Sequence, residues 1–130
     1  MPERPSPLPD ADTAPFWKAA AAGRLEIQRC LDCGLWVFYP RSVCPGCGGA
    51  ALEWAATSGR ATVYSYTVVH RAPAEFRDEV PYVVALVDLE EGPRLMTRLL
   101  GVEPGQARVG LPVEVEFGGE PPLPYFRRRS

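Results

Sequence analysis

The sequence predicts a mainly β protein in which a short N-terminal helix leads into a four-cysteine metal ribbon and then into a five-stranded barrel. Three observations support this prediction. All four cysteines occur as two C-x-x-C pairs within one short segment. After residue 59, apolar and polar residues alternate in runs separated by turn residues, which is typical of β-strands. Fifteen prolines and twelve glycines among 130 residues favour short strands and turns over long helices.

Three regions are expected along the chain. Residues 1–24 are predicted to form a flexible tail and the N-terminal helix, residues 25–54 the ribbon, and residues 55–130 the barrel domain. The whole length suits one ordinary domain or two very small ones.

Composition and charge narrow the class of protein. The formal net charge is -2 at pH 7, so the chain as a whole has no electrostatic attraction to nucleic acid. No apolar run approaches the length that spans a bilayer, and the N-terminus lacks the apolar core of a signal peptide. Thiols that are kept reduced for a metal suit a reducing compartment. We therefore expect a cytoplasmic protein that binds neither nucleic acid nor membranes.

The N-terminal helix is predicted from its start and stop signals. Asp12 or Thr13 can cap it, and Gly23 can end it in the left-handed conformation. A helix this short is marginal in water, so its Phe16 and Trp17 must bury against something. They pack either on the body of this protein or on a partner subunit.

The ribbon is predicted from the spacing of the cysteines. Cys30 and Cys33 form one pair, and Cys44 and Cys47 form the other. A two-residue spacing lets one tight turn direct both sulfurs at a single ion, and two such pairs give the tetrahedral set of four thiolates that Zn²⁺ prefers. Such a shell is closed, so the metal is expected to be structural. Iron in the same sulfur cage is one alternative, and two disulfides, each closing a small strained ring, are the other.

Strands are expected on both sides of the first cysteine pair. Residues 25–29 alternate and lead into it, and residues 36–39 lead out of it, so the two runs should form a hairpin. Residues 52–54 are expected to lead out of the ribbon, and residues 55–59 to form a small-residue connector.

The barrel is predicted from the rest of the chain. The expected strands cover residues 61–70, 81–88, 94–100, 111–117 and, as a short fifth strand, 123–126. Five short antiparallel strands in this order fit a small closed barrel such as the OB-fold. A small open sandwich is the alternative.

Catalytic signatures are mostly absent. The sequence contains no H-E-x-x-H, no P-loop, no G-x-G-x-x-G after a strand and no G-x-S-x-G elbow. His70 is the only histidine, and no nearby serine or cysteine stands out as its nucleophile. The favoured interpretation is a structural or interface histidine, and no residue is assigned a catalytic role.

Two segments beyond the helix are candidates for contact with a partner or ligand. The loop of residues 73–81 follows His70 and Arg71 and is long for a hairpin, although an ordinary solvent loop is the alternative. Near the C-terminus, Tyr125 and Phe126 precede three arginines and could stack on an adenine while the arginines bind phosphates. A barrel strand that ends in a solvated basic tail is the alternative there.

In this order the motifs resemble a known family. The F-W helix, C-x-x-C-G, C-P-x-C-G, G-R-A-T-V-Y-S-Y-T-V-V-H-R, P-Y-V-V-A-L-V-D-L and L-P-Y-F are similar to DUF35 proteins. The resemblance covers residues 13–127, and the strand from Tyr64 to Arg71 makes it specific, because many ribbons share the cysteine motif alone. It implies a rubredoxin-like zinc ribbon joined to an OB-fold, with one zinc held by the four cysteines.

The resemblance also implies a function: a non-catalytic partner of an acyl-CoA enzyme with a thiolase or hotdog fold. Some family members bridge two enzymes, some help to hold the CoA ester, and some keep the partner soluble. In steroid side-chain degradation such a domain pairs with a thiolase-like aldolase, which releases a side-chain fragment by retro-aldol cleavage of a CoA ester. We expect an accessory subunit of this kind, which stabilises its partner and helps to form the CoA-ester site. The residues expected near the partner or the CoA ester are Phe16, Trp17, His70, Arg71, Tyr125 and Phe126.

Other functions stay open on the sequence alone. The partner could be a hotdog-fold hydratase or an acetyltransferase–thiolase complex. A nucleic-acid-binding OB protein would need a basic groove with exposed aromatic residues. An electron carrier would hold iron in the thiolates, and a stand-alone enzyme would need a nucleophile beside a base.

Overall fold

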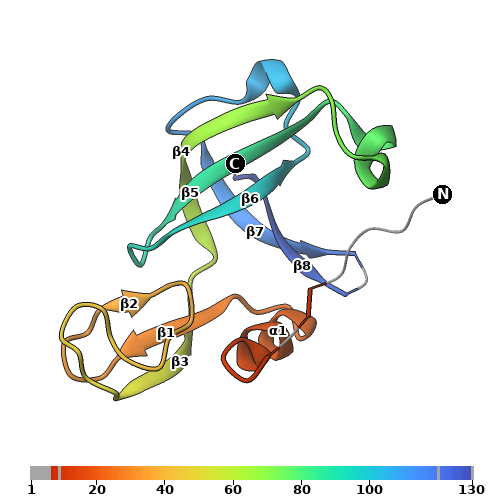
Figure 1. The fold of residues 1–130 in the computed structure, drawn as a ribbon. Helices are drawn as coiled ribbons and strands as arrows, with labels where there is room; N and C mark the ends of the chain where they lie inside the picture. Colours follow the sequence, from red (N-terminus) through yellow and green to blue (C-terminus); the bar gives the residue numbers. More distant parts are fainter. Residues whose placement is uncertain (1–6, 9, 120, 130) are drawn as a thin grey trace.

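A computed structural model describes residues 7, 8, 10–119 and 121–129 of the chain. In it a three-stranded sheet and helix α1 lie at one end of a closed barrel (Figure 1). The elements are α1 (Ala14–Ala21), β1 (Glu26–Cys30), β2 (Trp36–Val37), β3 (Leu52–Ala56), β4 (Arg60–Val69), η1 (Ala74–Glu79), β5 (Tyr82–Leu89), β6 (Arg94–Leu100), η2 (Pro104–Gln106), β7 (Pro112–Gly118) and β8 (Leu123–Arg128). No helix in this described part has both the length and the apolar character needed to cross a bilayer.

Helix α1 follows a polar turn. The amide and the hydroxyl of Thr13 donate hydrogen bonds to Oδ1 of Asp10 over 2.8 and 2.9 Å, and these bonds lower the pKa of the Asp10 carboxyl. Thr13 occupies the predicted cap position, but its side chain makes no capping bond to the helix. Gly23 follows the helix with a φ of 79°, the left-handed conformation that was predicted.

The ribbon sheet has one strand more than the predicted hairpin. Its order is β2-β1-β3, with both neighbours antiparallel to β1. The added strand β3 comes from residues that were expected only to lead out of the ribbon, and it places Ala55 opposite Ile27. Local alternation cannot reveal this pairing, because the two strands are joined through both cysteine turns.

The barrel closes in the order β4-β5-β6-β8-β7, which is the strand arrangement of an OB-fold. The predicted fold class is therefore confirmed. One pair differs from the expected all-antiparallel arrangement, because β6 and β8 run parallel and place Leu99 beside Phe126. The long connection through β7 brings the last strand back to this edge and closes the barrel.

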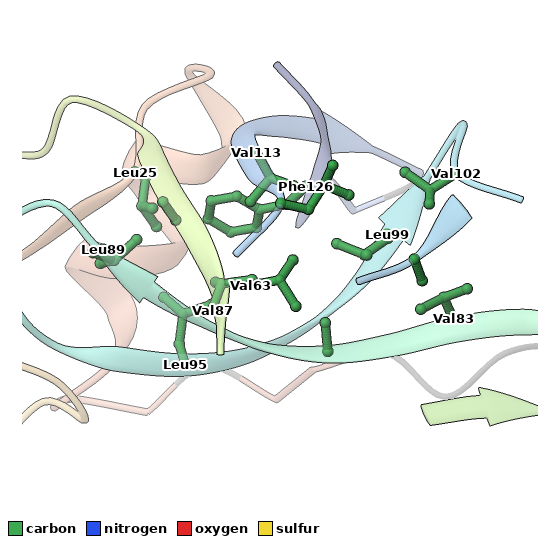
Figure 2. Close-up of a cluster of buried hydrophobic side chains, with 14 of the residues drawn as sticks. Leu25, Val63, Val83, Val87, Leu89, Leu95, Leu99, Val102, Val113 and Phe126 are labelled. Atoms are coloured by element: carbon green, nitrogen blue, oxygen red, sulfur yellow. The ribbon is translucent and has the colours of Figure 1, made fainter. Parts of the chain in front are cut away.

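One apolar core joins the three parts of the chain. Inside the barrel, Phe126, Val87 and Val113 are fully buried (Figure 2). Phe16 from α1 and Leu25 from the segment before β1 belong to the same buried cluster. The helix and the ribbon therefore pack on the barrel through side chains that no single part could bury alone.

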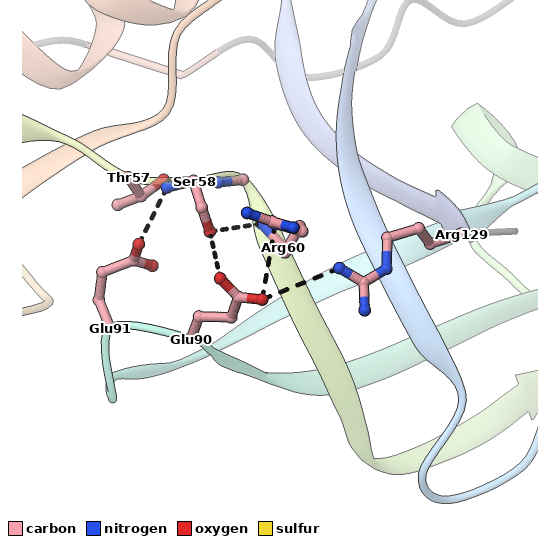
Figure 3. A network of polar contacts seen from close by, with 7 residues as sticks. Thr57, Ser58, Arg60, Glu90, Glu91 and Arg129 are labelled. Carbon is pink, nitrogen blue, oxygen red and sulfur yellow. Dashed lines mark hydrogen bonds and ion pairs between the residues drawn. The ribbon is translucent and has the colours of Figure 1, made fainter.

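A polar network fixes the connector between ribbon and barrel (Figure 3). The amide of Ser58 donates to Oε2 of Glu91 over 2.9 Å, and its hydroxyl donates to Oε2 of Glu90 over 3.0 Å. Glu90 also forms ion pairs with Arg60 at 3.5 Å and Arg129 at 3.8 Å. The turn between β5 and β6 is thereby tied to the point at which the chain leaves the ribbon.

Gly59 in this connector allows a testable prediction. Its φ is 79°, and a Cβ at this position would lie 2.8 Å from Cγ1 of Val115. We expect Gly59→Ala to lower the free energy of unfolding by about 1–2 kcal/mol for the left-handed backbone and by about 1–3 kcal/mol more for overpacking. Gly23→Ala is the matched control, since its φ is also 79° but nothing lies within 4 Å. Equal losses for the two variants in urea unfolding would contradict the clash.

Candidate metal centre and contact surfaces

The four cysteine sulfurs form one cluster, in which all of them lie within 4.8 Å of one another. The sulfurs of Cys30 and Cys47 are 3.6 Å apart, as are those of Cys33 and Cys44. Metal–sulfur bonds of about 2.3 Å in a regular tetrahedron place sulfurs about 3.8 Å apart. All four thiols are free, and each of these short distances joins the two C-x-x-C pairs. The cluster fits a metal ion bound by four thiolates.

The turns around the cysteines direct backbone N–H groups at the sulfurs. Gly34 and Gly48, which follow the second cysteine of each pair, have φ values of 78° and 77°, the left-handed conformation that glycine adopts without a steric penalty. The amide of Gly46 donates to the sulfur of Cys44 over 3.3 Å, and that of Gly49 donates to the sulfur of Cys47 over 3.4 Å. Such donors stabilise thiolates more than thiols.

These donors are not enough to ionise all four thiols. The amides of Cys47 and Gly46 lower the pKa of Cys44 to about 7. The amide of Gly49 favours the thiolate of Cys47, but the sulfur of Cys30 and burial outweigh it and raise the pKa of Cys47 to about 12. A cation at the centre of the cluster would supply the missing positive charge, so the chemistry of the donor set fits a bound metal.

A buried amide fixes the segment between the two cysteine pairs. The side chain of Gln28 on β1 accepts a hydrogen bond from the Arg41 amide over 2.7 Å and donates one to the Arg41 carbonyl over 2.8 Å. These two bonds imitate strand pairing and hold the segment at Arg41, close to its end at Cys44. The sequence alone does not identify Gln28 as a buried residue. Alternation along β1 predicts that its side chain faces solvent, and only the folded structure shows this segment covering it.

A groove of about 330 Å³ lies where α1, the ribbon and the barrel meet. Helix α1 contributes Phe16 and Trp17, the ribbon contributes Phe38 and Tyr39, and β8 contributes Tyr125. The ring of Phe16 lies 4.9 Å from that of Trp17 and 6.1 Å from that of Phe38, measured between centroids. The groove is therefore walled largely by aromatic rings from three parts of the chain.

The structure separates the residues that were expected near a partner or the CoA ester. Trp17 and Tyr125 are half-buried and line the groove. Phe126 is fully buried in the barrel, so the expectation that its side chain contacts a partner is wrong. Adjacent residues of a strand point to opposite faces, and Tyr125 takes the outer one. Phe16 lines the groove but is itself 8% exposed, so it packs mainly in the core.

The two remaining candidates lie elsewhere. His70 and Arg71 are exposed just after β4 and do not line the groove. The predicted contact loop after them contains the short helix η1. At its end, Oε1 of Glu79 lies 2.6 Å from Nη1 of Arg98, which is on the groove wall.

Two family models cover most of the chain. Residues 17–53 match "ChsH2, rubredoxin-like zinc ribbon domain", and residues 54–118 match "ChsH2, C-terminal OB-fold domain". A "DUF35 domain-containing scaffold protein" of Methanothermobacter thermautotrophicus is 39% identical over 91 residues, which are 69% of this chain and 68% of that protein. The chain belongs to the DUF35 family.

Two further similarities concern nearly the whole DUF35 chain. A "Probable enoyl-CoA hydratase alpha subunit" of Thermomonospora curvata is 41% identical over 127 residues, which are 95% of this chain but 40% of that protein. The chain thus spans less than half the length of this relative. A chain of the solved structure described as "Ltp2-ChsH2(DUF35) aldolase" is 40% identical and superimposes with a TM-score of 0.86, over 95% of this chain and 98% of that one.

Proposed function

We propose that this DUF35 chain is a non-catalytic accessory subunit of an acyl-CoA enzyme complex and that its partner is a thiolase-like aldolase. The observation that carries the proposal is the match in fold and in length to a chain of the Ltp2-ChsH2(DUF35) aldolase. In this role the chain stabilises the aldolase and helps to form its CoA-ester site. The substrate class implied by the resemblance is a CoA ester of a steroid side chain, cleaved by a retro-aldol reaction.

Two structural features support a non-catalytic role. The four thiolates of the cysteine cluster fill a tetrahedral shell, so a metal held there has no open position for a substrate. The one histidine of the chain, His70, lies exposed after β4 and outside the groove. The chemistry of the complex is therefore assigned to the partner.

We infer that Cys30, Cys33, Cys44 and Cys47 bind one structural Zn²⁺ per chain. The spacing of the pairs, the sulfur separations and the match to a zinc ribbon domain support zinc over iron. The ion would join the end of β1 to the turn that contains Cys44 and Cys47. Because thiols that are kept reduced for a metal suit a reducing compartment, we place the complex in the cytoplasm.

A hotdog-fold hydratase is the second candidate partner. It is favoured by the hydratase name of the Thermomonospora relative. That likeness covers 40% of the relative's length, whereas the aldolase likeness covers 98% of the matched chain. The aldolase therefore takes precedence.

Co-expression tests the proposal directly. A thiolase-like protein from the genome that encodes this chain should co-elute with it as one peak of larger mass in size exclusion, and CoA-ester cleavage should occur only in that peak. A thiolase-like protein that is soluble and active by itself, and that elutes separately from this chain, would refute the accessory role. Repeating the experiment with a hotdog-fold hydratase from the same genome tests the second candidate.

A further inference from the structure

The groove between α1, the ribbon and the barrel is bordered by apolar side chains that the described chain leaves uncovered. Met96 on β6 is 72% exposed and Tyr39 on the ribbon is 59% exposed, and both line the groove. Such large apolar groups are costly to leave in water. When they surround a concave surface, they indicate an interaction site.

The groove carries no uncompensated charge. Among the described residues that line it, Arg98 is the only charged one. Its guanidinium lies 2.6 Å from the carboxylate of Glu79 and 4.4 Å from the ring centroid of Tyr82. The ion pair with Glu79 neutralises the charge of Arg98, although its buried Nε has no hydrogen-bond partner among the described residues. Phosphates of CoA or of a nucleic acid would therefore find no unpaired positive charge in the groove. A neutral apolar group is the complementary occupant.

The apolar surface also extends beyond the groove. Leu86 on β5 lies directly opposite Met96 in the sheet, so the two side chains share the outer face of the barrel. A small molecule inside the groove would leave this face in water. A protein surface with a protruding side chain would cover the groove and the face together.

We propose that this groove is the docking site for the partner enzyme, which places a neutral apolar or aromatic side chain between α1 and the ribbon and covers Met96. This inference rests on the proposed function and adds which surface of the DUF35 chain the partner binds. An anchor residue held in a pocket with apolar surface around it is the usual energetic centre of a protein interface.

The metal centre is connected to one wall of this docking groove and would fix its position. Phe38 and Tyr39 belong to the segment between the cysteine pairs, which begins after Cys33 and ends at Cys44. A metal would hold both ends of the segment, and Gln28 holds it at Arg41. Loss of the metal should therefore weaken partner binding even while the barrel stays folded.

The test uses two variants on opposite walls of the groove and one matched control. Met96→Asp and Tyr39→Asp place a charge at the rim, and Val109→Asp places one on a residue that is 65% exposed and outside the groove. Affinity for the thiolase-like protein of the co-expression experiment is measured by titration calorimetry, with circular dichroism as the check on folding. We expect at least about tenfold weaker binding for the two groove variants and unchanged binding for the control.

The outcomes separate the docking site from the proposed function. If wild type does not bind the thiolase-like protein, both proposals fail. If wild type binds it and the groove variants bind equally well, the accessory role stands and the docking site is wrong. Two other results would also overturn the docking site: self-association of the chain that Met96→Asp abolishes, or binding of a free acyl-CoA that Tyr39→Asp abolishes. The first would assign the groove to a second copy, and the second to the substrate.

Discussion

Replacing Cys44 with serine should remove the metal and unfold the ribbon. The Cys44 side chain is 1% exposed, and its sulfur lies 3.6 Å from that of Cys33, so a hydroxyl there leaves a buried gap in the donor set. Metal binding in small zinc domains contributes on the order of 10 kcal/mol to folding. We therefore expect loss of amide protection over β1, β2 and β3 in hydrogen exchange, together with lower solubility.

The metal content of the same proteins is the second readout. Elemental analysis should give about one zinc per wild-type chain, as expected for a closed thiolate site, and no stoichiometric metal for Cys44→Ser. Ser42→Ala is the control, because Ser42 is exposed in the same segment and has no sulfur. A red wild-type protein that contains iron, or a serine variant that keeps its zinc, would contradict the assignment.

Replacing Phe126 with alanine should cost about 3–5 kcal/mol of unfolding free energy, the usual loss for a buried phenylalanine. The ring is 0% exposed and lies among the barrel side chains (Figure 2). Its strand also forms the parallel pair with β6, with Phe126 beside Leu99, so the cavity would open where the barrel closes.

Chemical denaturation of the metal-loaded protein measures this effect. Val109→Ala is the control, since Val109 is 65% exposed and surface truncations usually change stability by less than about 0.5 kcal/mol. A loss of less than about 1 kcal/mol for Phe126→Ala would be too small for a core phenylalanine. The ring would then lie outside the core, where it could contact a partner after all.

Features that follow from local sequence could be predicted, and features that depend on distant contacts could not. The cysteine cluster was accessible because two residues between thiols determine a turn whatever surrounds it. The barrel strands were accessible because alternation reports a buried and an exposed face. The pairing of β3 with β1 was missed, since it depends on a partner that lies beyond both cysteine turns.

The contact residues illustrate the same limit at the level of single side chains. Tyr125 and Phe126 look alike as a pair of aromatics, and only the register of β8 places one outside and the other in the core. The structural role of Gln28 could not be predicted, because it depends on hydrogen bonds to Arg41, 13 residues away in the sequence. The groove itself has walls from three parts of the chain, so no stretch of sequence contains it.

The order of the strands along the sequence separates two stages of folding during synthesis. The ribbon sheet is complete at Ala56, so it can capture its ion before β4 has been synthesised, whereas its packing on the shared core waits for the barrel. The barrel, in contrast, stays open until β8 emerges, because this last strand bridges β6 and β7. In that interval the meander of β4, β5 and β6 presents unpaired edges that invite aggregation. A shortage of metal would therefore impair folding of the ribbon early in synthesis. Loss of β8 would act late and would leave a metal-bound ribbon attached to an open barrel.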